Sequence, residues 1–435
     1  MGHQIKKILE KTLRFFAVRI LSKYRPEVIA ITGSVGKTST KEAIYAVLAG
    51  RKNVRQNLKN YNNEIGTPLT IIGAEAAGKN LLKWLLVFSK AARLIIFRDK
   101  RYPQILILEM GSDHPGDIKY LTDFVPIKVG VITRVAPVHL EFFGSIEQIA
   151  KEKSILIQSL KKDGTAILNG DDRLVSVMAK KSKAKTLTFG LLAHNNLYAK
   201  EIAVSHEFDY KDISTIQGIS FKLVYDGKTL PVLLPKVLGE HLVYTALAAI
   251  AVGIVYDINL HDIIESLKNF EPPKGRMRLI GGVKNTLIID DTYNSSPLSA
   301  RKALYQLGQI NLNHSHKKFA VLGDMLELGS YTEQGHHEVG EAAKEYGIDF
   351  LITVGERARD IVRGAVDEGM NPDHCFNFKT SLEAGKFLQD RISEGDLILI
   401  KGSQGVRMER AVKEIMAEPQ RAEELLVRQD KGWDR

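Results

Sequence analysis

A glycine-rich loop between a short apolar segment and a helix start constrains this chain more than any other feature. The segment reads Ile29-Ala-Ile-Thr-Gly-Ser-Val-Gly-Lys-Thr-Ser-Thr40. Gly33 and Gly36 let the backbone turn tightly, so that its N–H groups can face an anion at the helix N-terminus, where partial positive charge accumulates. A strand, loop and helix in this order are typical of a parallel α/β sheet and predict a phosphate-binding loop.

The side chains of this loop indicate a nucleotide and a metal ion. Lys37 is placed to reach the β- and γ-phosphates, and the Thr38 hydroxyl is placed to bind Mg²⁺. The spacing is the short Thr-Gly-x-x-Gly-Lys-Thr variant, because Ile31 stands where the general pattern has its first glycine. A glycine turn without a nucleotide is the alternative. The predicted ATP-binding residues of the loop are Gly33, Ser34, Gly36, Lys37, Thr38 and Ser39.

Candidate partners for the metal ion follow two other apolar runs. A Mg²⁺ ion bound to phosphates usually needs a carboxylate as well. Glu109 follows the run at 105–108, and ligand groups of α/β sheets lie at the carboxyl ends of strands. Taken alone, Glu109 is either such a ligand or a solvated strand-end residue. His139 comes after the run at 129–133, and a lone histidine there is more often a packing or surface residue.

Alternating apolar segments and helical patterns predict the fold class, which is α/β with a doubly wound, P-loop central ATPase domain followed by a Rossmann-like C-terminal domain. A linker at 272–275 separates the two. We expect a basic amphipathic N-terminal helix at 1–27, the central domain at 28–274 with a helical insertion at about 78–101, and the C-terminal domain at 275–435. The segments from about 186 to 234 look like an antiparallel appendage. Predicted strands cover 28–32, 105–109, 129–133, 165–168, 286–289, 319–322, 350–354 and 397–400, and predicted helices cover 37–48, 146–161 and 244–255.

The net charge of +10 is concentrated in two short segments. Residues 1–25 and residues 79–101 each carry seven basic side chains and one acidic side chain, a balance of +6 per segment, and the rest of the chain balances at −2. Both segments have apolar residues at helical spacing, so we expect amphipathic helices with their bases on the opposite face. These helices either pack on the protein body or lie on an anionic membrane surface. Nucleic-acid binding is disfavoured, because no known motif accompanies the bases.

The composition excludes several classes of protein. With 44% apolar and 26% charged residues, the chain resembles ordinary globular proteins rather than disordered or multi-span membrane chains. The apolar run near residue 90 is a poor membrane span, because Lys83, Lys90 and Arg93 would each cost roughly 2.5–3.5 kcal/mol at a bilayer centre. A single cysteine, Cys375, excludes an intramolecular disulfide and fits a reducing compartment. We therefore expect a cytoplasmic protein, either free or peripheral to the inner face of the membrane.

Eight motifs follow one another along the chain. They are Thr32 to Thr40, Asn57-Leu-Lys-Asn-Tyr-Asn-Asn-Glu-Ile-Gly-Thr67, Glu109-Met-Gly-Ser-Asp-His-Pro-Gly116, Val138-His-Leu-Glu-Phe-Phe-Gly-Ser145, Gly275-Arg-Met-Arg278, Asp290-Asp-Thr-Tyr-Asn294, Leu322-Gly-Asp-Met-Leu-Glu-Leu-Gly329 and Lys401-Gly-Ser-Gln-Gly-Val-Arg-Met-Glu409. Together they resemble the Mur ligases, and most of all the branch that adds D-alanyl-D-alanine to a UDP-N-acetylmuramoyl tripeptide. The resemblance runs from about residue 28 to residue 415.

This resemblance implies an ATP- and Mg²⁺-dependent amide ligase of peptidoglycan precursor synthesis. The acceptor carboxylate would take the γ-phosphoryl group, giving an acyl phosphate and ADP, and the amine of D-Ala-D-Ala would then attack. Since two anions must meet, cations have to screen their repulsion. By motif position the resemblance makes Lys37, Glu109, His139 and Lys153 catalytic and puts Thr38, Glu109, His139 and Lys153 around two Mg²⁺ ions. It also implies that Lys153 is carbamylated; a simple surface lysine is the alternative.

Further roles carry over from the resemblance. Arg276 and Asp291 would contact ATP, at the phosphates and near the ribose. The implied partners are D-Ala-D-Ala and a muramoyl-peptide acceptor, with no nucleic acid, and we expect a monomer. The implied substrate-binding residues are Asn62, Asn63, Glu64, Tyr293, Asn294, Lys401, Ser403 and Arg407. The last three could instead be surface caps or salt-bridge residues.

Two departures from the family pattern concern the base and the acceptor. The stretch Gly-x-His-Asn-x-x-Asn-Ala reads Gly239-Glu-His-Leu-Val-Tyr-Thr-Ala246, so Leu242 and Thr245 replace two amides and we expect altered base recognition. Only about 27 residues precede the strand before the loop, too few for the UDP-binding domain of family members. We therefore expect that domain to be missing and its place taken by the basic helix, which leaves a lipid-linked or membrane-proximal acceptor open. The alternative functions are a related amino-acid-adding ligase, such as a folyl-polyglutamate type, and a catalytically silent, nucleotide-gated membrane module.

Overall fold

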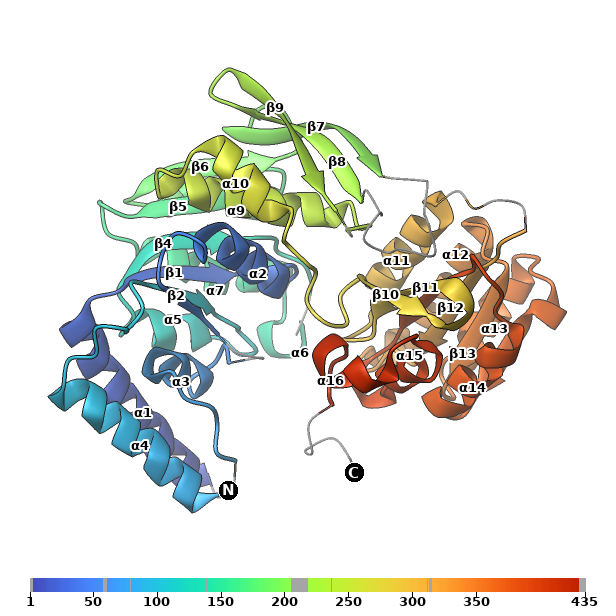
Figure 1. The fold of residues 1–435 in the computed structure, drawn as a ribbon, viewed down its shortest axis with the longest axis horizontal. Helices are drawn as coiled ribbons and strands as arrows, with labels where there is room; N and C mark the ends of the chain where they lie inside the picture. The colour runs from blue at the N-terminus through green and yellow to red at the C-terminus, as the bar shows by residue number, and fades with distance from the viewer. Residues whose placement is uncertain are drawn as a thin grey trace. The chain divides into compact units, whose positions relative to one another are not determined.

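The computed structural model describes residues 3–57, 61–78, 80–137, 140–204, 218–235, 237–310, 312 and 315–429. The chain divides into two compact units. The first contains residues 1–201, 221–232 and 241–270, and the second contains residues 202–220, 233–240 and 271–435. Figure 1 shows the elements of both units.

A mostly parallel sheet forms the centre of the first unit. Strand β1 lies inside it, pairing in parallel with β3 on one side and β4 on the other, and its residues 28–32 are all buried, as expected for a strand covered on both faces. The order of the strands is β2 (Val54–Gln56), β3 (Ile105–Glu109), β1 (Glu27–Thr32), β4 (Ile127–Ile132), β5 (Thr165–Asn169), β6 (Lys185–Gly190), β7 (Leu197–Val204), β8 (Ile219–Tyr225) and β9 (Lys228–Leu234).

The antiparallel appendage expected from residue 186 begins later than predicted. Strand β6 pairs with β5 in parallel and therefore continues the main sheet. Strands β8 and β9 do form a hairpin at the end of the sheet. Its two turn residues, Asp226 and Gly227, both have positive φ, as a tight two-residue hairpin turn requires.

Helices cover both faces of this sheet, which confirms the predicted doubly wound α/β class. Helices α2, α9 and α10 lie on one side, and α1, α3, α4, α5 and α7 lie on the other (Figure 1). The helices of this unit are α1 (His3–Tyr24), α2 (Lys37–Leu48), α3 (Gly66–Ile72), α4 (Leu81–Ile96), α5 (Asp117–Thr122), α6 (Leu140–Phe143), α7 (Ile146–Gln158), α8 (Arg173–Ser176), α9 (His241–Val255) and α10 (Leu260–Leu267).

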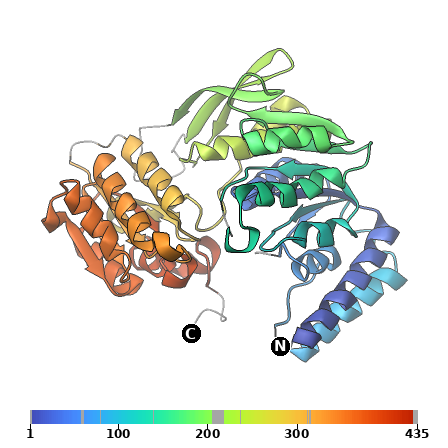
Figure 2. The same ribbon diagram turned by 180° about the vertical axis from the view of Figure 1, so that it is seen from behind.

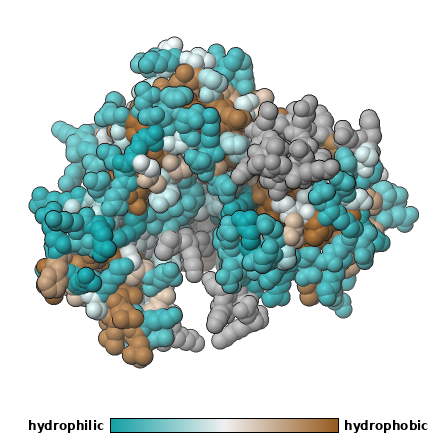
Figure 3. All heavy atoms as spheres, viewed as in Figure 1, coloured by the Kyte–Doolittle hydropathy of each residue, from teal (hydrophilic) through white to brown (hydrophobic). Residues whose placement is uncertain are grey.

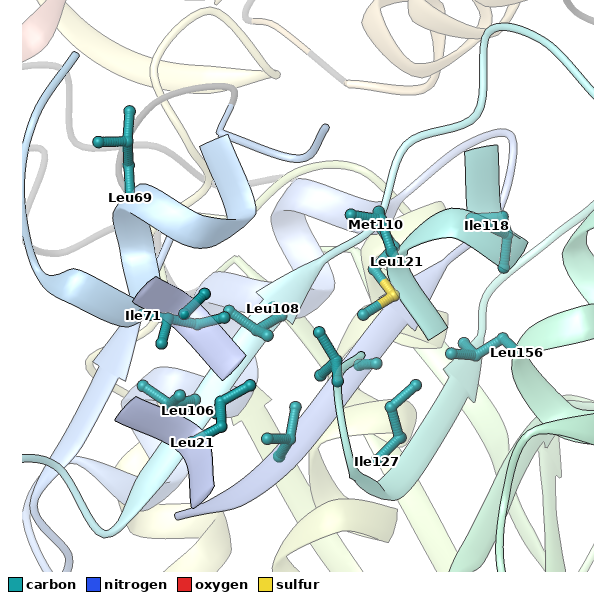
Figure 4. Packing of buried hydrophobic residues seen from close by; sticks show 14 of the residues in the cluster. Leu21, Leu69, Ile71, Leu106, Leu108, Met110, Ile118, Leu121, Ile127 and Leu156 are labelled. Atoms are coloured by element: carbon teal, nitrogen blue, oxygen red, sulfur yellow. The ribbon is translucent and has the colours of Figure 1, made fainter. Parts of the chain in front are cut away.

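The two basic segments form the predicted helices α1 and α4, which lie side by side (Figure 2). The Phe16 ring stacks on the Phe88 ring, and the Tyr24 hydroxyl donates to the Leu94 carbonyl at 3.1 Å. These contacts advance together along both helices, so the helices run in the same direction. Leu21 of α1 belongs to the apolar core that also holds residues of α3 and β3 (Figure 4). The basic segments thus pack on the protein body, which is the first of the two alternatives, and this packing leaves their outer sides open to a membrane surface.

The side of α4 that faces solvent differs from the expectation. Leu81, Leu82, Leu85 and Leu86 are exposed, whereas the sequence pattern assigned that face to basic residues. Lys83, Lys90 and Arg93 are exposed as predicted, so the prediction was wrong only for the leucines. Apolar residues cover so much of this helix that a helical pattern alone does not show which of them face the core. Among the described helices, none is long and apolar enough to cross a membrane.

The second unit has its own sheet, with apolar cores on both faces. Alternate strand residues point to opposite sides: Leu287 and Ile289 belong to one core, and Ile288 belongs to the other. All pairings are parallel except that of β10 with β11. The order is β10 (Arg278–Gly282), β11 (Thr286–Asp291), β15 (Leu397–Lys401), β12 (Lys318–Gly323), β13 (Phe350–Val354) and β14 (Cys375–Phe378). The helices are α11 (Pro297–Gln309), α12 (Thr332–Glu345), α13 (Arg359–Asp367), α14 (Ser381–Arg391), α15 (Glu409–Ile415) and α16 (Ala422–Leu425).

Candidate active site

The glycine loop follows β1 and leads directly into α2, as predicted. A Cβ atom on Gly33 would lie 2.0 Å from the Thr133 hydroxyl, so only glycine fits there. Gly36 adopts φ 86° as the residue before the first turn of α2. The Lys37 ammonium donates to the Gly33 carbonyl at 2.8 Å, so the lysine side chain folds back over its own loop.

The segment after β4 holds the glycine loop in place. The Ser34 amide donates to the Arg134 carbonyl at 2.6 Å, and the Ser34 hydroxyl donates to the Ala136 carbonyl at 3.0 Å. The Thr133 hydroxyl donates to the Val35 carbonyl at 2.6 Å. Sequence reasoning missed this role of Thr133, for which a polar residue ending an apolar strand was the available signal. His139 follows on the same segment and lies outside the described residues.

Glu109 meets the loop at the carboxyl ends of two neighbouring strands. The parallel register pairs Ile31 of β1 with Glu109 of β3, which puts this carboxylate next to the loop. Its side chain is buried; one carboxylate oxygen accepts from the Thr38 hydroxyl at 3.0 Å and the other from the Asn62 amide at 3.2 Å. The structure thus brings Thr38 and Glu109 together, as predicted, and adds Asn62, which was predicted to bind the acceptor, as a partner of Glu109.

These oxygen atoms fit a Mg²⁺ ion, which prefers hydroxyl, carboxylate, phosphate and water oxygens. Within the described part of the chain there is no group of three or more His, Cys, Asp or Glu side chains that could hold a metal. Thr38 and Glu109 would therefore supply two ligands, and phosphate and water would supply further ones. Such an incomplete protein shell is typical of Mg²⁺ sites that bind the metal together with a nucleotide.

Lys153 is buried on α7, and its ammonium group donates to the Ser112 hydroxyl at 2.9 Å. Burial and, after it, the positive charge of Lys37 lower the pKa of Lys153 to about 7. A large share of these side chains is therefore neutral at physiological pH, which a surface lysine would not be. The alternative of a simple surface lysine is excluded by this burial.

Two residues that support Lys153 were not predicted. Ser112 is its hydrogen-bond partner, and Glu152 anchors the start of α5, accepting from the amides of Gly116 at 2.9 Å and Ile118 at 2.8 Å. Glu152 is itself buried. Glu152 therefore holds the far end of the loop that runs from Glu109 through Ser112 to the start of α5. No sequence pattern indicates this role, because the partners of Glu152 are backbone amides.

The three predicted residues at 62–64 have different environments. Only Asn62 reaches Glu109. The Asn63 side chain accepts from the amides of Ile65 and Gly66 at 3.3 and 2.9 Å, so it caps the start of α3. Glu64 forms an ion pair with Lys6 of α1 at 3.0 Å. The end of the basic helix thus adjoins the predicted acceptor loop.

In the second unit, the start of β10 and the end of β11 form a second cluster. The Arg276 guanidinium lies over the Tyr293 ring, 4.1 Å from its centre. Asp290 is fully buried and accepts from the Gly275 amide at 3.0 Å and the Thr292 hydroxyl at 2.6 Å. Burial raises the pKa of Asp290 to about 6. Asp290 therefore ties the linker segment around Gly275 to the loop after β11.

The predicted residues on β15 and in the loop after it contact this second cluster. The Lys401 ammonium pairs with the Asp291 carboxylate at 2.6 Å and donates to the Asn294 carbonyl at 2.9 Å. The Ser403 hydroxyl accepts from the Leu326 amide at 2.9 Å. Lys401 and Ser403 are both buried, so they contact protein groups rather than solvent.

Arg407 lies at the edge of the same cluster, beside a residue that sequence reasoning missed. Arg407 pairs with the fully buried Glu409, whose other oxygen accepts from Arg428 at 3.1 Å. Arg428 also donates to the carbonyls of Thr292 and Tyr293, the latter at 3.2 Å. Arg428 lies beyond the last recognisable motif, so its role had no signal in the sequence.

The two residues that depart from the family pattern lie on α9. Leu242 is 1% exposed and Thr245 is 4% exposed. Neither side chain offers a free hydrogen-bonding edge at the surface. The altered base recognition stays a prediction. Leu242 is part of the packed interior.

The fold and the loop together define a nucleotide-binding P-loop α/β protein with a second, Rossmann-like unit. The chain belongs to the Mur ligase family. The family model described as Mur ligase middle domain matches residues 31–82 and 91–253, and the one described as Mur ligase, glutamate ligase domain matches residues 275–404. The resemblance drawn from the sequence motifs is confirmed.

Individual relatives point to one branch of the family. The UDP-N-acetylmuramoyl-tripeptide–D-alanyl-D-alanine ligase of Bacillus subtilis is 32% identical over 94% of this chain and 79% of its own length. The crystal structure of MurF from Acinetobacter baumannii is similar with a TM-score of 0.76 at 28% identity, covering 92% of this chain and 79% of that one. The MurF ligase from Thermotoga maritima, solved in complex with ADP, has a TM-score of 0.73 at 26% identity, covering 93% and 83%.

Proposed function

We propose that the chain is an ATP-dependent, ADP-forming ligase of peptidoglycan precursor synthesis that joins D-Ala-D-Ala to the carboxylate of a muramoyl tripeptide. The observation that carries this proposal is the contact between the Thr38 hydroxyl and the Glu109 carboxylate, at 3.0 Å, directly behind a phosphate-type loop. The proposed substrates are those in the names of the relatives. The family motifs along this chain support assigning the same substrates to it.

The first unit holds the triphosphate. The loop amides between Gly33 and Ser39 and the Lys37 ammonium neutralise the phosphates. Mg²⁺, when bound, would neutralise charge on the transferring phosphoryl group, held by Thr38 and Glu109 and by His139 as the sequence predicts. Asn62 orients Glu109 through its amide. These positive groups would let an acceptor carboxylate approach the triphosphate. A carboxylate oxygen bonds to the γ-phosphorus while the bond from that phosphorus to the β,γ-bridging oxygen breaks, giving an acyl phosphate and releasing ADP.

Lys153 has the chemistry that carbamylation requires. A neutral amine attacks CO₂, a nitrogen–carbon bond forms and one proton leaves, giving an anionic carbamate. The lowered pKa makes the neutral amine available near pH 7. A carbamate at this position would add carboxylate-like oxygens to a site where the described residues form no group of three or more acidic, histidine or cysteine metal ligands. Carbamylated Lys153 would therefore supply a negative ligand for a second metal ion.

The residues of the second unit bind ATP and position one another. The family resemblance assigns Arg276 to the phosphates and Asp291 to the ribose. Tyr293 orients the Arg276 guanidinium by stacking, and Lys401 holds Asp291 and the Asn294 backbone. Asn294, Ser403 and Arg407 are the other predicted substrate-binding residues of the second unit, and Asn63 and Glu64 are predicted ones of the first. Several of these act through protein contacts rather than by touching the substrate.

A related acceptor, lipid-linked or membrane-proximal, is the alternative. The ion pair between Lys6 of α1 and Glu64 favours it, because this pair connects a basic helix with an exposed apolar side to the acceptor loop. In this form the ligase is a cytoplasmic monomer held peripherally at the inner face of the membrane. Both versions use the same site chemistry and differ only in what carries the acceptor.

A phosphate-release assay tests the proposal. The full-length protein is incubated with ATP, Mg²⁺, D-Ala-D-Ala and either soluble UDP-linked tripeptide or lipid-linked tripeptide in anionic vesicles. Release that requires both D-Ala-D-Ala and an acceptor supports ligation, and the preferred acceptor chooses between the two versions. The Lys37→Ala variant is the control for contaminating ATPases. Release without dependence on either substrate, or none with any acceptor, would refute the ligase.

A further inference from the structure

We propose that α1 and α4 together form a docking surface for an anionic lipid bilayer. The outer face of this helix pair is defined here by Ile8 and Phe15 of α1 and by Leu81, Leu82, Leu85 and Leu86 of α4. The proposal does not depend on the ligase chemistry, because it concerns a surface that is distinct from the glycine loop.

The outer face exposes an unusual amount of apolar side chain. Its four leucines are 63–79% exposed, and Ile8 and Phe15 are 65% and 53% exposed. Figure 3 shows the hydrophobic colour gathered over this helix pair. Elsewhere in the described residues, Leu192 lies outside any helix, and Leu298 shares α11 with one other exposed large apolar side chain, Tyr305. A contiguous patch of this kind marks an interaction site.

The helix pair is well packed on its inner side, so the exposed leucines are not a misplaced core. The rings of Phe16, Phe88 and Trp84 stack in succession. The Lys23 ammonium donates to the carbonyls of Leu94 at 3.0 Å and Ile95 at 2.7 Å, which closes the end of α4. The outer face is therefore a surface on a firmly attached element.

The positive charge of the two segments indicates that the outer face binds an anionic surface. Each segment balances at +6, whereas the rest of the chain balances at −2. Lys11, Arg19 and Lys83 are exposed on the helices that carry the apolar row. Apolar side chains that enter the acyl boundary, flanked by bases at the headgroups, are the pattern of a helix lying in an anionic membrane interface. A second copy docking through the same face would bring two strongly positive segments together, which like-charge repulsion opposes.

Docking would also bring the predicted acceptor loop, which contains Asn62 and Glu64, near the membrane. Lys6, near the start of α1, pairs with Glu64 of the loop that reaches Glu109 through Asn62. With the outer face on the bilayer, this loop would lie close to the headgroup layer. A surface-bound substrate would then reach the loop without leaving the membrane.

Vesicle sedimentation with the full chain tests the docking surface. Vesicles contain phosphatidylcholine alone, or phosphatidylcholine and phosphatidylglycerol in equal parts. The variant Leu81→Ser/Leu85→Ser should bind the anionic vesicles at least tenfold more weakly, since a fully inserted leucine contributes about a tenfold factor by itself. The matched control is Leu192→Ser/Leu298→Ser, with leucines of similar exposure elsewhere, and it should bind like the unaltered protein. Replacing Lys11 and Lys83 by glutamine should weaken binding roughly fivefold per base.

The outcomes separate the possible occupants. Binding that requires phosphatidylglycerol, falls with added salt and is lost only in the Leu81/Leu85 variant supports the proposal. Absence of binding, or equal loss in both leucine variants, would overturn it. Dimerisation in analytical ultracentrifugation that disappears in the Leu81/Leu85 variant, with no vesicle binding, would assign the face to a second copy. All substituted positions are exposed, and thermal unfolding by circular dichroism verifies that each variant is folded.

Discussion

Replacement of Lys153 by methionine should abolish ligation and at the same time stabilise the first unit near neutral pH. Methionine has a similar length and no charge, so it fills the same buried space on α7. It cannot form a carbamate, hence the loss of activity. The gain in stability follows from the cost of keeping an ammonium group in that place, which the lowered pKa of Lys153 reports.

The gain in the free energy of unfolding that Lys153→Met provides should decrease as the pH rises. A shift of the lysine pKa from 10.5 to about 7 corresponds to roughly 5 kcal/mol against the charged form. Between about pH 7 and pH 10.5 the unfolded chain holds more protons than the folded one, so wild-type stability rises with pH through this window. The advantage of the methionine variant should therefore be greatest below pH 7. By pH 9.5 it should have shrunk by about 3 kcal/mol.

Urea unfolding followed by tryptophan fluorescence measures this difference. The chain has two tryptophans, and Trp433→Phe leaves Trp84, a buried residue of the first unit, as the reporter. Unfolding curves are compared at pH 6 and pH 9.5 with and without Lys153→Met. If methionine destabilises the unit equally at both pH values, Lys153 is a stabilising charged residue and the reasoning fails. Labelling with ¹³C-bicarbonate should also show a carbamate NMR signal that disappears in Lys153→Met.

Other substitutions test the remaining contacts. Lys37→Ala should lower turnover by at least a hundredfold because a phosphate-facing cation is lost; near-normal phosphate release would refute the loop assignment. Glu152→Gln should cost about 1–2 kcal/mol in urea unfolding, since one buried amide loses its acceptor, and should lower kcat with little change in KM. Arg428→Met should cost about 3 kcal/mol because Glu409 keeps a buried charge with one partner fewer; no change in the urea midpoint would contradict this. With Leu242 and Thr245 at the amide positions, GTP should replace ATP with no more than about a tenfold loss of kcat/KM, and a much greater loss would show that base recognition is intact.

Much of the fold could be predicted because its buried parallel strands leave a continuous apolar signal. Strand β3 and helix α2 were placed at their observed bounds, 105–109 and 37–48. Strand β6 was misjudged for a physical reason: its buried Leu187 and Phe189 alternate with the half-buried Thr186 and Thr188, which resembles a half-covered antiparallel strand. Periodicity reports how a strand is covered rather than the direction of its neighbour.

The site could be predicted only where side chains meet a ligand or each other through a known motif. The contact of Thr38 with Glu109 belongs to this group, because glycine spacing and a strand end define both positions. Glu152 and Arg428 could not be found, since they bind backbone amides and carbonyls that every residue possesses. The outward leucines of α4 were missed because its apolar residues extend well beyond the side that packs on the core, so their pattern does not show which of them are buried.

The charge of Lys37 influences the reactivity of Lys153, and a bound nucleotide would change that influence. Lys37 contributes to the lowered pKa of Lys153, so the cation that awaits the phosphates also keeps the second lysine neutral. A triphosphate that neutralised Lys37 would raise the pKa of Lys153 only in part, because burial, the larger cause of its lowered pKa, would remain. We therefore expect carbamylation of Lys153 to be more favourable before the nucleotide binds than after it. Such a carbamate would carry the negative charge that the predicted second metal ion needs.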